Sequence, residues 1–176
     1  MSEVLKNIQE RRSIRKYDSR SVDDEMLDKI LDAGRWAPSG GNSQPYRFIV
    51  IKENIELIKA VSPNLYGYPP IIIAACLELP ETASKDTECI HILGLGAAIQ
   101  NMLLAATSLG LASCWCGCVH LRNEVEQILG IKEDENLHVY SLIAIGYASE
   151  KPKPPTRKAL SEIAFINEID KPWRKN

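Results

Sequence analysis

This chain of 176 residues lacks segments that would carry it into a membrane. No run of about 18 uncharged, purely apolar residues occurs. The nearest stretch, from Ile92 to Leu111, is interrupted by the polar residues Gln100, Asn101 and Ser108. The first residues, Met1 to Lys6, do not hold the long apolar core of a signal peptide. We therefore expect a cytoplasmic protein with no membrane partner.

The chain also lacks the common catalytic and nucleotide-binding motifs. It has no Gly-x-Ser-x-Gly elbow and no Walker loop. Gly94 and Gly96 lack the third glycine of a dinucleotide fingerprint and begin inside a predicted helix. None of His91, His120 and His138 is spaced from a carboxylate or cysteine as in a recognised catalytic motif, so we predict no catalytic side chain. A net charge of -2 gives no bulk attraction to nucleic acid.

Five cysteines, an odd number without a secretory signal, indicate a reducing compartment rather than a disulfide framework. Cys114, Cys116 and Cys118 alternate in a segment, 112–119, that we expect to be a strand. Three thiols about 6–7 Å apart along one strand face do not converge easily on one zinc ion. We therefore predict no metal site and expect small buried hydrophobic residues, while a redox role for this cluster stays open.

Helical and strand periodicities are mixed along the chain without a strict βαβ repeat, which favours an α+β fold in a single domain spanning residues 1–176. The continuous apolar run 71–76 predicts a strand buried on both faces. Gly110 is the expected end of a long helix. The expected helices are 3–9, one between Asp23 and Pro38, 55–61, 89–109 and 122–129, and the expected strands are 47–51, 71–76, 112–119 and 137–145.

The helix expected at 89–109 is apolar almost all round, which is typical of a helix buried in a larger core or at a subunit interface. A chain this short would struggle to cover it, so we expect this helix to form the core of a dimer. The tail after Arg157 has scattered apolar residues without a periodic pattern, so we expect it to pack on a partner subunit.

A basic cluster follows the first expected helix and consists of Arg11, Arg12, Ser13 and Arg15. Arginine offers a planar fork of donors that matches phosphate oxygens, so the cluster suggests a phosphate clamp. A second basic point, Arg157-Lys158, follows a proline-rich loop that could return to the first. The alternative interpretation is a solvated basic segment or a nucleic-acid arm.

A second polar loop, 38–45, packs glycines, amides and a hydroxyl between two prolines. Asn and Gln side chains carry paired donors and acceptors that suit the edge of a heterocycle. Together with the basic cluster, this loop indicates a site for a phosphorylated, planar cofactor. Alone it is also typical of an ordinary helix-to-strand turn.

These motifs resemble those of the nitroreductase family of FMN-dependent oxidoreductases. The resemblance rests on Arg-Arg-Ser-x-Arg at 11–15, Ala-Pro-Ser at 37–39 and Asn-x-Gln-Pro at 42–45, and it continues through 94–117 and 146–160. It implies a homodimer with a central, mostly antiparallel sheet flanked by helices, and FMN in a cleft between the subunits. NADH or NADPH would be the reductant.

The resemblance also implies roles for individual residues. The FMN phosphate would be held by Arg11, Ser13, Arg157 and, less directly, Lys158, with Arg12 beside them. Arg15 would reach the flavin pyrimidine edge, where a cation stabilises the negative charge of the reduced ring. The partner's flavin would be contacted by the loop residues Pro38, Ser39, Gly40 and Asn42, which Gln44 supports. Main-chain groups of Trp115, Cys116 and Gly117 would face flavin N5 and O4.

The implied activity is hydride transfer from NAD(P)H through flavin N5 to a small electron-poor acceptor such as a nitroaromatic or a quinone. Because the cofactor supplies the chemistry, no acid–base pair is required. A flavin-binding carrier or sensor without turnover is the alternative. The chain has little between Val61 and Ile71, so we expect an open site or a lid formed by the segment 64–70, which carries Tyr66 and Tyr68; a plain surface turn is the other interpretation.

Overall fold

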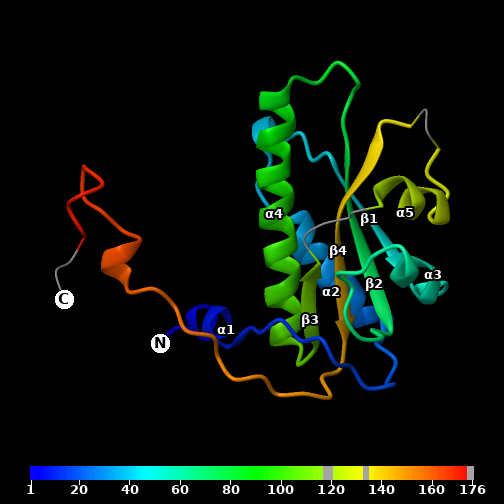
Figure 1. Cartoon of the computed structure of the whole chain (residues 1–176), viewed down its shortest axis with the longest axis horizontal. Coiled ribbons are helices and arrows are strands. Elements are labelled where there is room, and N and C mark those ends of the chain that lie inside the picture. The colour runs from blue at the N-terminus through cyan, green and yellow to red at the C-terminus, as the bar shows by residue number, and fades with distance from the viewer. Residues whose placement is uncertain (117–120, 133–134, 174–176) are drawn as a thin grey trace.

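The computed structural model describes residues 1–116, 121–132 and 135–173. Its centre is a four-stranded sheet in which all neighbouring strands are antiparallel, in the order β1-β2-β4-β3 (Figure 1). The strands are β1 (Tyr46–Ile51), β2 (Ile71–Glu78), β3 (Ala112–Cys116) and β4 (Leu137–Gly146). With helices on both faces, this is the α+β fold with an antiparallel sheet that the sequence predicts.

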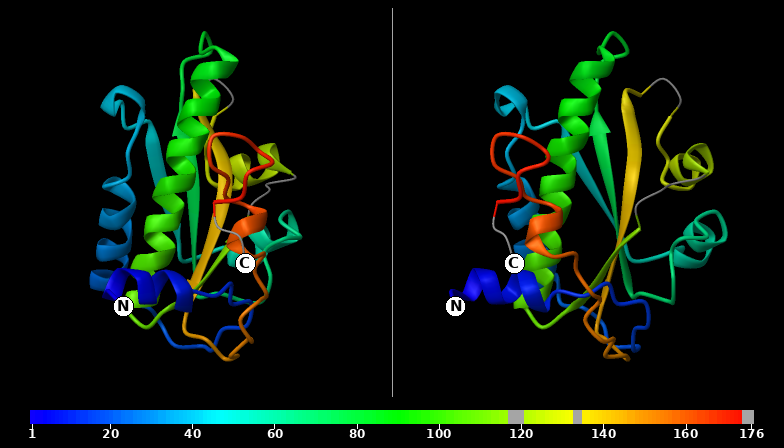
Figure 2. Two further views of the ribbon diagram at one scale, coloured as in Figure 1. Left: turned by 90° about the vertical axis from the view of Figure 1, so that its left-hand side faces the viewer. Right: turned by 60° about the vertical axis from the view of Figure 1, so that its left-hand side comes forward.

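Helices cover the sheet on its two sides (Figure 2). One face carries α2 (Asp24–Arg35) and α4 (Lys85–Ser108), and the other carries α3 (Ile55–Ala60) and α5 (Arg122–Ile128). Because side chains alternate along a strand, β2 sends Ile73 to the first face and Ile72 to the second. Both are fully buried, which confirms that 71–76 is a strand covered on both faces.

The ends of α4 follow from local interactions. The helix begins four residues before the expected Cys89, because Ser84 accepts a hydrogen bond from the Thr87 N–H at 3.1 Å, and apolar periodicity does not reveal such a cap. At the other end Gly110 adopts a φ of +74°, the left-handed conformation that commonly follows a helix. Gly110 is therefore confirmed as the residue that terminates the helix.

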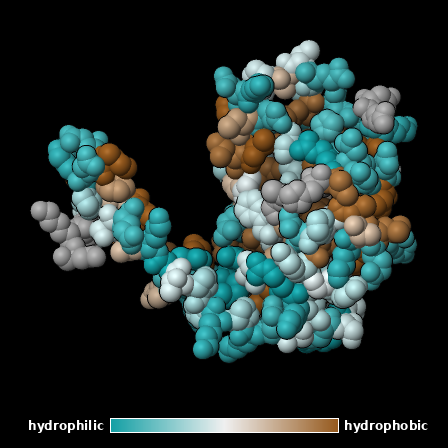
Figure 3. Space-filling model, viewed as in Figure 1, coloured by the Kyte–Doolittle hydropathy of each residue, from teal (hydrophilic) through white to brown (hydrophobic). Residues whose placement is uncertain are grey.

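Only one side of α4 is covered in this chain. Ile99 and Met102 are buried against the sheet, whereas Ile90 and Leu93 are 52% and 71% exposed. Figure 3 shows apolar atoms gathered over the upper half of this helix. By length and composition alone α4 could cross a membrane, a test that core helices of soluble proteins also pass. Here it packs along the sheet and α2, and its other side exposes apolar side chains.

The N-terminal segment crosses one end of the sheet. Helix α1 (Glu3–Glu10) is fixed to α4 by a hydrogen bond from Asn7 Nδ2 to the Leu104 carbonyl, 2.8 Å long. The chain then runs beside β3, where the Ile14 N–H donates to the Ser113 carbonyl at 3.0 Å. These two contacts place the basic cluster next to an edge strand of the sheet.

The C-terminal tail leaves the rest of the molecule. After β4 the chain turns back toward α1, and the tail, which includes the short helix η2 (Leu160–Glu162), projects outward (Figure 1). Its apolar residues include Ile163 and Trp173, which are 61% and 52% exposed. The tail bonds to itself, since the Trp173 N–H donates to the Ala164 carbonyl at 2.8 Å.

Candidate functional site

Basic residues from both ends of the chain meet in one hollow of about 330 Å³. They arrive from the N-terminal segment and from the proline-rich segment after β4, which runs back past α1. The hollow is lined by Arg11, Arg12, Ser13, Arg15, Pro152, Lys153, Pro155 and Arg157. The structure therefore brings together the two basic points that are nearly 150 residues apart in the sequence.

The positive charges around Arg11 in this hollow repel its guanidinium. Burial lowers the pKa of Arg11, and the guanidiniums of Arg157 and Arg12 lower it further. Such crowding disfavours the charged form, so an anion placed between the arginines would relieve their repulsion. A phosphate group, with several acceptor oxygens, suits this set of donors.

The predicted basic residues differ in whether their side chains are already hydrogen-bonded within the protein. Arg12 folds back onto the preceding main chain, where its Nη1 donates to the Gln9 carbonyl at 2.5 Å and to the Arg11 carbonyl at 2.8 Å. Lys158 is exposed and is not among the described residues that line the hollow. Lys153 lines it instead, and the sequence interpretation missed this residue. The sequence pattern that could have indicated Lys153 is the alternation of lysine and proline at 151–155, because prolines restrict the backbone and the lysines repeat a positive charge along it.

The segment 64–70 packs against Arg15. The Arg15 guanidinium carbon lies 5.4 Å from the centre of the Tyr66 ring, and Gly67, at a φ of +71°, closely approaches the Arg15 carbonyl. A side chain at position 67 would collide with that carbonyl. Lys59 Nζ holds the segment from α3, since it donates to the Gly67 carbonyl at 2.7 Å and lies 3.2 Å from the Tyr68 ring centre. The segment is thus anchored beside the basic hollow.

The polar loop between α2 and β1 bonds mainly to itself. It contains the short helix η1 (Gly40–Asn42), and the Ser39 hydroxyl accepts from the Gln44 N–H at 3.0 Å. Gln44 Nε2 in turn donates to the Asn42 carbonyl at 3.2 Å. The Pro38 carbonyl accepts from the Tyr46 hydroxyl at 2.6 Å.

Within one chain this loop contacts the first half of α4, and α1, which leads into the basic cluster, contacts its second half. Gly40 approaches Ile90 near the start of the helix, whereas α1 is bonded to Leu104 near its end. Ile90 and Leu104 are 14 residues apart, which is about 21 Å along a helix axis. In a single copy of the chain, the two predicted walls of the site are thus anchored to different turns of α4.

The end of β3 forms a third predicted wall. Trp115 lies on the α4 side and is 40% exposed, and its indole lies against Gly96 of α4. Its Nε1–H donates to the Ser141 hydroxyl at 2.6 Å, and that hydroxyl donates to the Cys116 carbonyl at 2.9 Å. The sequence interpretation missed Ser141, whose signal is a hydroxyl inside an apolar strand. Gly117 lies outside the described residues.

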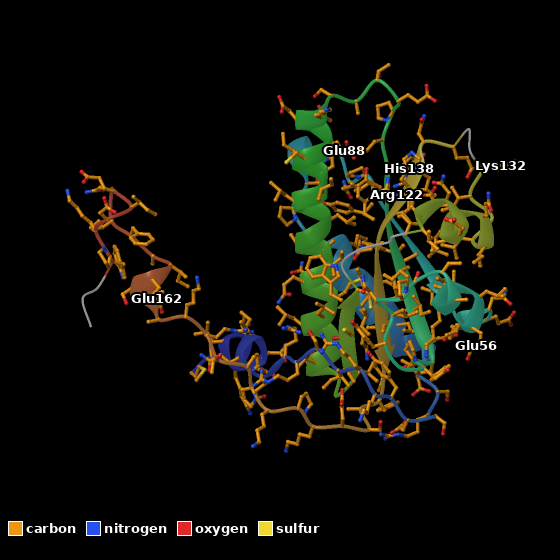
Figure 4. The ribbon with its side chains drawn as sticks, viewed as in Figure 1. Glu56, Glu88, Arg122, Lys132, His138 and Glu162 are labelled. Atoms are coloured by element: carbon orange, nitrogen blue, oxygen red, sulfur yellow. The ribbon has the colours of Figure 1, made fainter. Side chains whose placement is uncertain are left out.

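A second polar cluster lies at the upper end of β4, away from the basic hollow (Figure 4). The Tyr140 hydroxyl donates to Glu88 at 2.7 Å, and the Arg122 guanidinium carbon lies 4.7 Å from the Tyr140 ring centre. Burial and then the Glu88 carboxylate raise the pKa of Tyr140 to about 12. Nearby, His138 Nδ1 is 3.4 Å from Glu126. Sequence spacing did not indicate these contacts, because they join three separate elements.

Among the residues that the structure describes, no group of three or more His, Cys, Asp or Glu side chains could hold a metal ion. A larger hollow, about 520 Å³, lies elsewhere, between α2 and β1. Its lining includes Leu31, Tyr46 and Phe48 together with charged residues of both signs. The candidate site is therefore identified by the arginines that converge on the smaller hollow, and not by the volume of the hollow.

Comparisons with known proteins point to one family. The model of the nitroreductase family matches residues 8–91 and 62–147, which together span most of the chain. A protein of Archaeoglobus fulgidus, assigned as an NADH dehydrogenase/NAD(P)H nitroreductase, is 38% identical over 157 residues and the match covers 86% of this chain and 88% of that protein. An FMN reductase (NAD(P)H) of Bacillus subtilis is 25% identical over 193 residues, covering 96% of this chain and 76% of that protein.

Solved structures give the same result. A protein from Desulfovibrio desulfuricans, assigned as a nitroreductase and crystallised in complex with FMN, is 31% identical and superposes with a TM-score of 0.82. The match covers 96% of this chain and 98% of that one. The fold is thus that of the nitroreductase-like α+β proteins. The chain belongs to the nitroreductase family.

Proposed function

We propose that this protein binds FMN and transfers hydride from NADH or NADPH to a small electron-poor acceptor, such as a nitroaromatic or a quinone. As a nitroreductase, the chain is an NAD(P)H-dependent flavin oxidoreductase with FMN as its cofactor. Bound FMN supplies the redox chemistry by accepting hydride and passing electrons on. The chain's own residues bind the cofactor, orient it and set its electrostatic surroundings.

The convergence of Arg11, Arg12 and Arg157 around one hollow carries this proposal. Arg157 and Arg12 disfavour the positive charge on Arg11, and the phosphate of FMN would relieve that repulsion. We assign Arg11, Ser13 and Arg157 to the phosphate, with Arg12 and Lys153 adding charge. Lys158 is not among the described residues that line the hollow, so we give it a lesser part.

Arg15 lies at the rim of the same hollow and is steadied by its neighbours. Its N–H donates to Glu150 Oε1 at 2.7 Å, and its side chain stacks near Tyr66. We propose that its guanidinium lies at the pyrimidine edge of the flavin and stabilises negative charge there. The main chain at Trp115 and Cys116 would face N5 and O4, and Gly117 would complete this wall.

We further propose that the protein is a cytoplasmic homodimer, in which residues 1–176 form one FMN-binding domain per subunit. The supporting observation is that the loop 38–44 contacts α4 at Ile90, whereas α1, which leads into the basic cluster, is bonded to Leu104, about 21 Å further along the helix axis. If two copies pack their α4 helices antiparallel through the exposed side that bears Ile90 and Leu93, the loop of one copy moves to the hollow of the other. The projecting tail would then pack on the partner.

Reduction of the bound flavin tests the proposed activity. The purified protein should be yellow and should release FMN on denaturation. In anaerobic stopped-flow mixing, NADH or NADPH should bleach the flavin absorbance within seconds, and an added quinone or nitroaromatic should restore it. Flavin that neither nucleotide bleaches would mean a carrier or sensor, and a colourless protein that does not take up FMN would refute the site itself.

A further inference from the structure

The Arg15 side chain is exposed, and its guanidinium lies over the ring of Tyr66. The guanidinium carbon is 5.4 Å from the ring centre. No hydrogen bond or ion pair joins this guanidinium to a residue that the structure describes. The face of an aromatic ring attracts a cation at such a distance. The Tyr66 ring is therefore the described group that determines where the positive charge of Arg15 lies.

The main chain on both sides of Tyr66 is fixed to the rest of the protein. Leu65 is 2% exposed and belongs to the core beneath α3 and α5. On the other side, Lys59 Nζ donates to the Gly67 carbonyl at 2.7 Å. Gly67 also lies so close to Arg15 that a β-carbon at position 67 would be 2.2 Å from the Arg15 carbonyl oxygen. The ring of Tyr66 is thus carried by an anchored segment and not by a free lid.

The main chain of Arg15 is fixed as well. The Ile14 N–H donates to the Ser113 carbonyl of β3 at 3.0 Å, and the Arg15 N–H donates to Glu150 Oε1 at 2.7 Å. The freedom that remains belongs to the Arg15 side chain, which is long and loses much rotamer entropy when it is held in one place. Contact with the Tyr66 ring limits that freedom before any ligand binds.

We propose that Tyr66 is a positioning residue, whose ring holds the Arg15 guanidinium at the pyrimidine edge of the flavin and thereby raises the reduction potential of bound FMN. This inference rests on the proposed function, in which Arg15 lies at that edge. FMN that has taken up two electrons and one proton carries a negative charge over N1 and C2=O. A cation that is already fixed beside that edge stabilises the charge without having to reorganise.

The ring of Tyr66, and not its hydroxyl, is what this role requires. The hydroxyl makes no hydrogen bond to a residue that the structure describes, and the side chain is 51% exposed. Tyr68 of the same segment offers a matched comparison, because it is 64% exposed and its ring centre lies 3.2 Å from Lys59 Nζ. Replacing Tyr68 removes an exposed ring that contacts a different cation.

Midpoint potentials of bound FMN test the inference. Each FMN-saturated protein is reduced slowly by xanthine and xanthine oxidase beside a reference dye. Tyr66→Leu should lower the potential, and the strength of one exposed cation–π contact limits the change to about 2- to 5-fold in the equilibrium, or about 9–21 mV for two electrons. Tyr66→Phe, which keeps the ring, and Tyr68→Leu should keep the wild-type potential. An unchanged potential in Tyr66→Leu would overturn the inference.

A double-mutant cycle shows whether Tyr66 acts through Arg15. In an Arg15→Gln background, Tyr66→Leu should cause no further change, because the cation that the ring positions is absent. Equal shifts in both backgrounds would mean that Tyr66 acts on the flavin directly, which contradicts the assigned role. Because xanthine oxidase supplies the electrons, a protein that does not react with NADH or NADPH still gives these potentials. Failure of the proposed activity and failure of this inference are therefore separate results.

The contact itself can be measured in the protein without FMN. The ring current of Tyr66 should move the Arg15 Nε–H resonance upfield in a proton–nitrogen correlation spectrum. Tyr66→Leu should remove this shift and Tyr66→Phe should keep it. An Arg15 resonance at the ordinary arginine position in folded wild-type protein would refute the inference, whether or not the variants fold.

Discussion

Replacing Arg11 with alanine is the most direct test of the phosphate site. Arg11 lines the basic hollow, and its pKa is lowered by burial and by Arg157 and Arg12. A hydrogen bond to a charged group contributes about 1.5–3 kcal/mol, so losing it should weaken FMN binding about 10- to 150-fold. The same change removes a repulsive charge, so the cofactor-free protein should be as stable as wild type or slightly more stable.

Flavin fluorescence titrations measure this effect with two ligands. FMN carries the phosphate and riboflavin does not, so Arg11→Ala should weaken FMN binding while it leaves riboflavin affinity nearly unchanged. Lys6→Ala is the matched control, because Lys6 is an exposed cation of α1 whose only described ion pair is a 4.0 Å contact with Glu10. It should bind FMN like wild type.

Two results would refute the reasoning. Equal FMN affinity in wild type and Arg11→Ala would mean that the hollow does not hold the phosphate. Equal losses for FMN and riboflavin would mean that the substitution damages the ring site or the fold, and circular dichroism and thermal unfolding of the cofactor-free variant separate these two causes.

Three further outcomes are expected. Co-expressed Arg11→Ala and Asn42→Ala chains should form mixed dimers in which one site combines an intact hollow with an intact loop and the other site has neither. Such dimers should hold about half the flavin of wild type, whereas mixed dimers without flavin would mean that both walls belong to the same chain. Gly110→Ala should lower the free energy of unfolding by about 1 kcal/mol in urea titrations, because position 110 has a φ of +74°. The pKa of Tyr140 is raised to about 12 in the folded protein, against about 10 in the unfolded chain. Between these pH values the folded protein keeps the tyrosine proton while the unfolded chain loses it, so the free energy of unfolding should fall as pH rises from about 10 to about 12. Urea titrations at pH 9 and 11.5 should show a smaller loss for Tyr140→Phe.

Much of the fold could be predicted from local patterns. The run 71–76 was predicted as a strand buried on both faces, and helices from both sides cover it. Gly110 was predicted to end a helix, and it does so in the left-handed conformation. The start of α4 was predicted four residues late, since the Ser84 cap depends on one hydrogen bond that hydrophobic periodicity does not register.

The site could be predicted only in its parts. Resemblance selected Arg11, Ser13 and Arg157, but it did not select Lys153, which lines the same hollow. Ser141, which ties the Trp115 indole to the Cys116 carbonyl, gave only the weak signal of a hydroxyl in an apolar strand. Both residues belong to the site only because separate segments of the chain pack together there, and a single sequence does not show which segments will be in contact.

By itself, the sequence determined where helices and strands form and which of their faces are apolar, because those properties depend on residues a few positions apart. The tertiary structure alone decided that Arg11 and Arg157 share a hollow, that the loop 38–44 contacts the first half of α4, and that Tyr66 lies beside Arg15. These are contacts between distant parts of the chain. They arise when the apolar faces pack into one core, and that packing sets which charged and polar groups become neighbours.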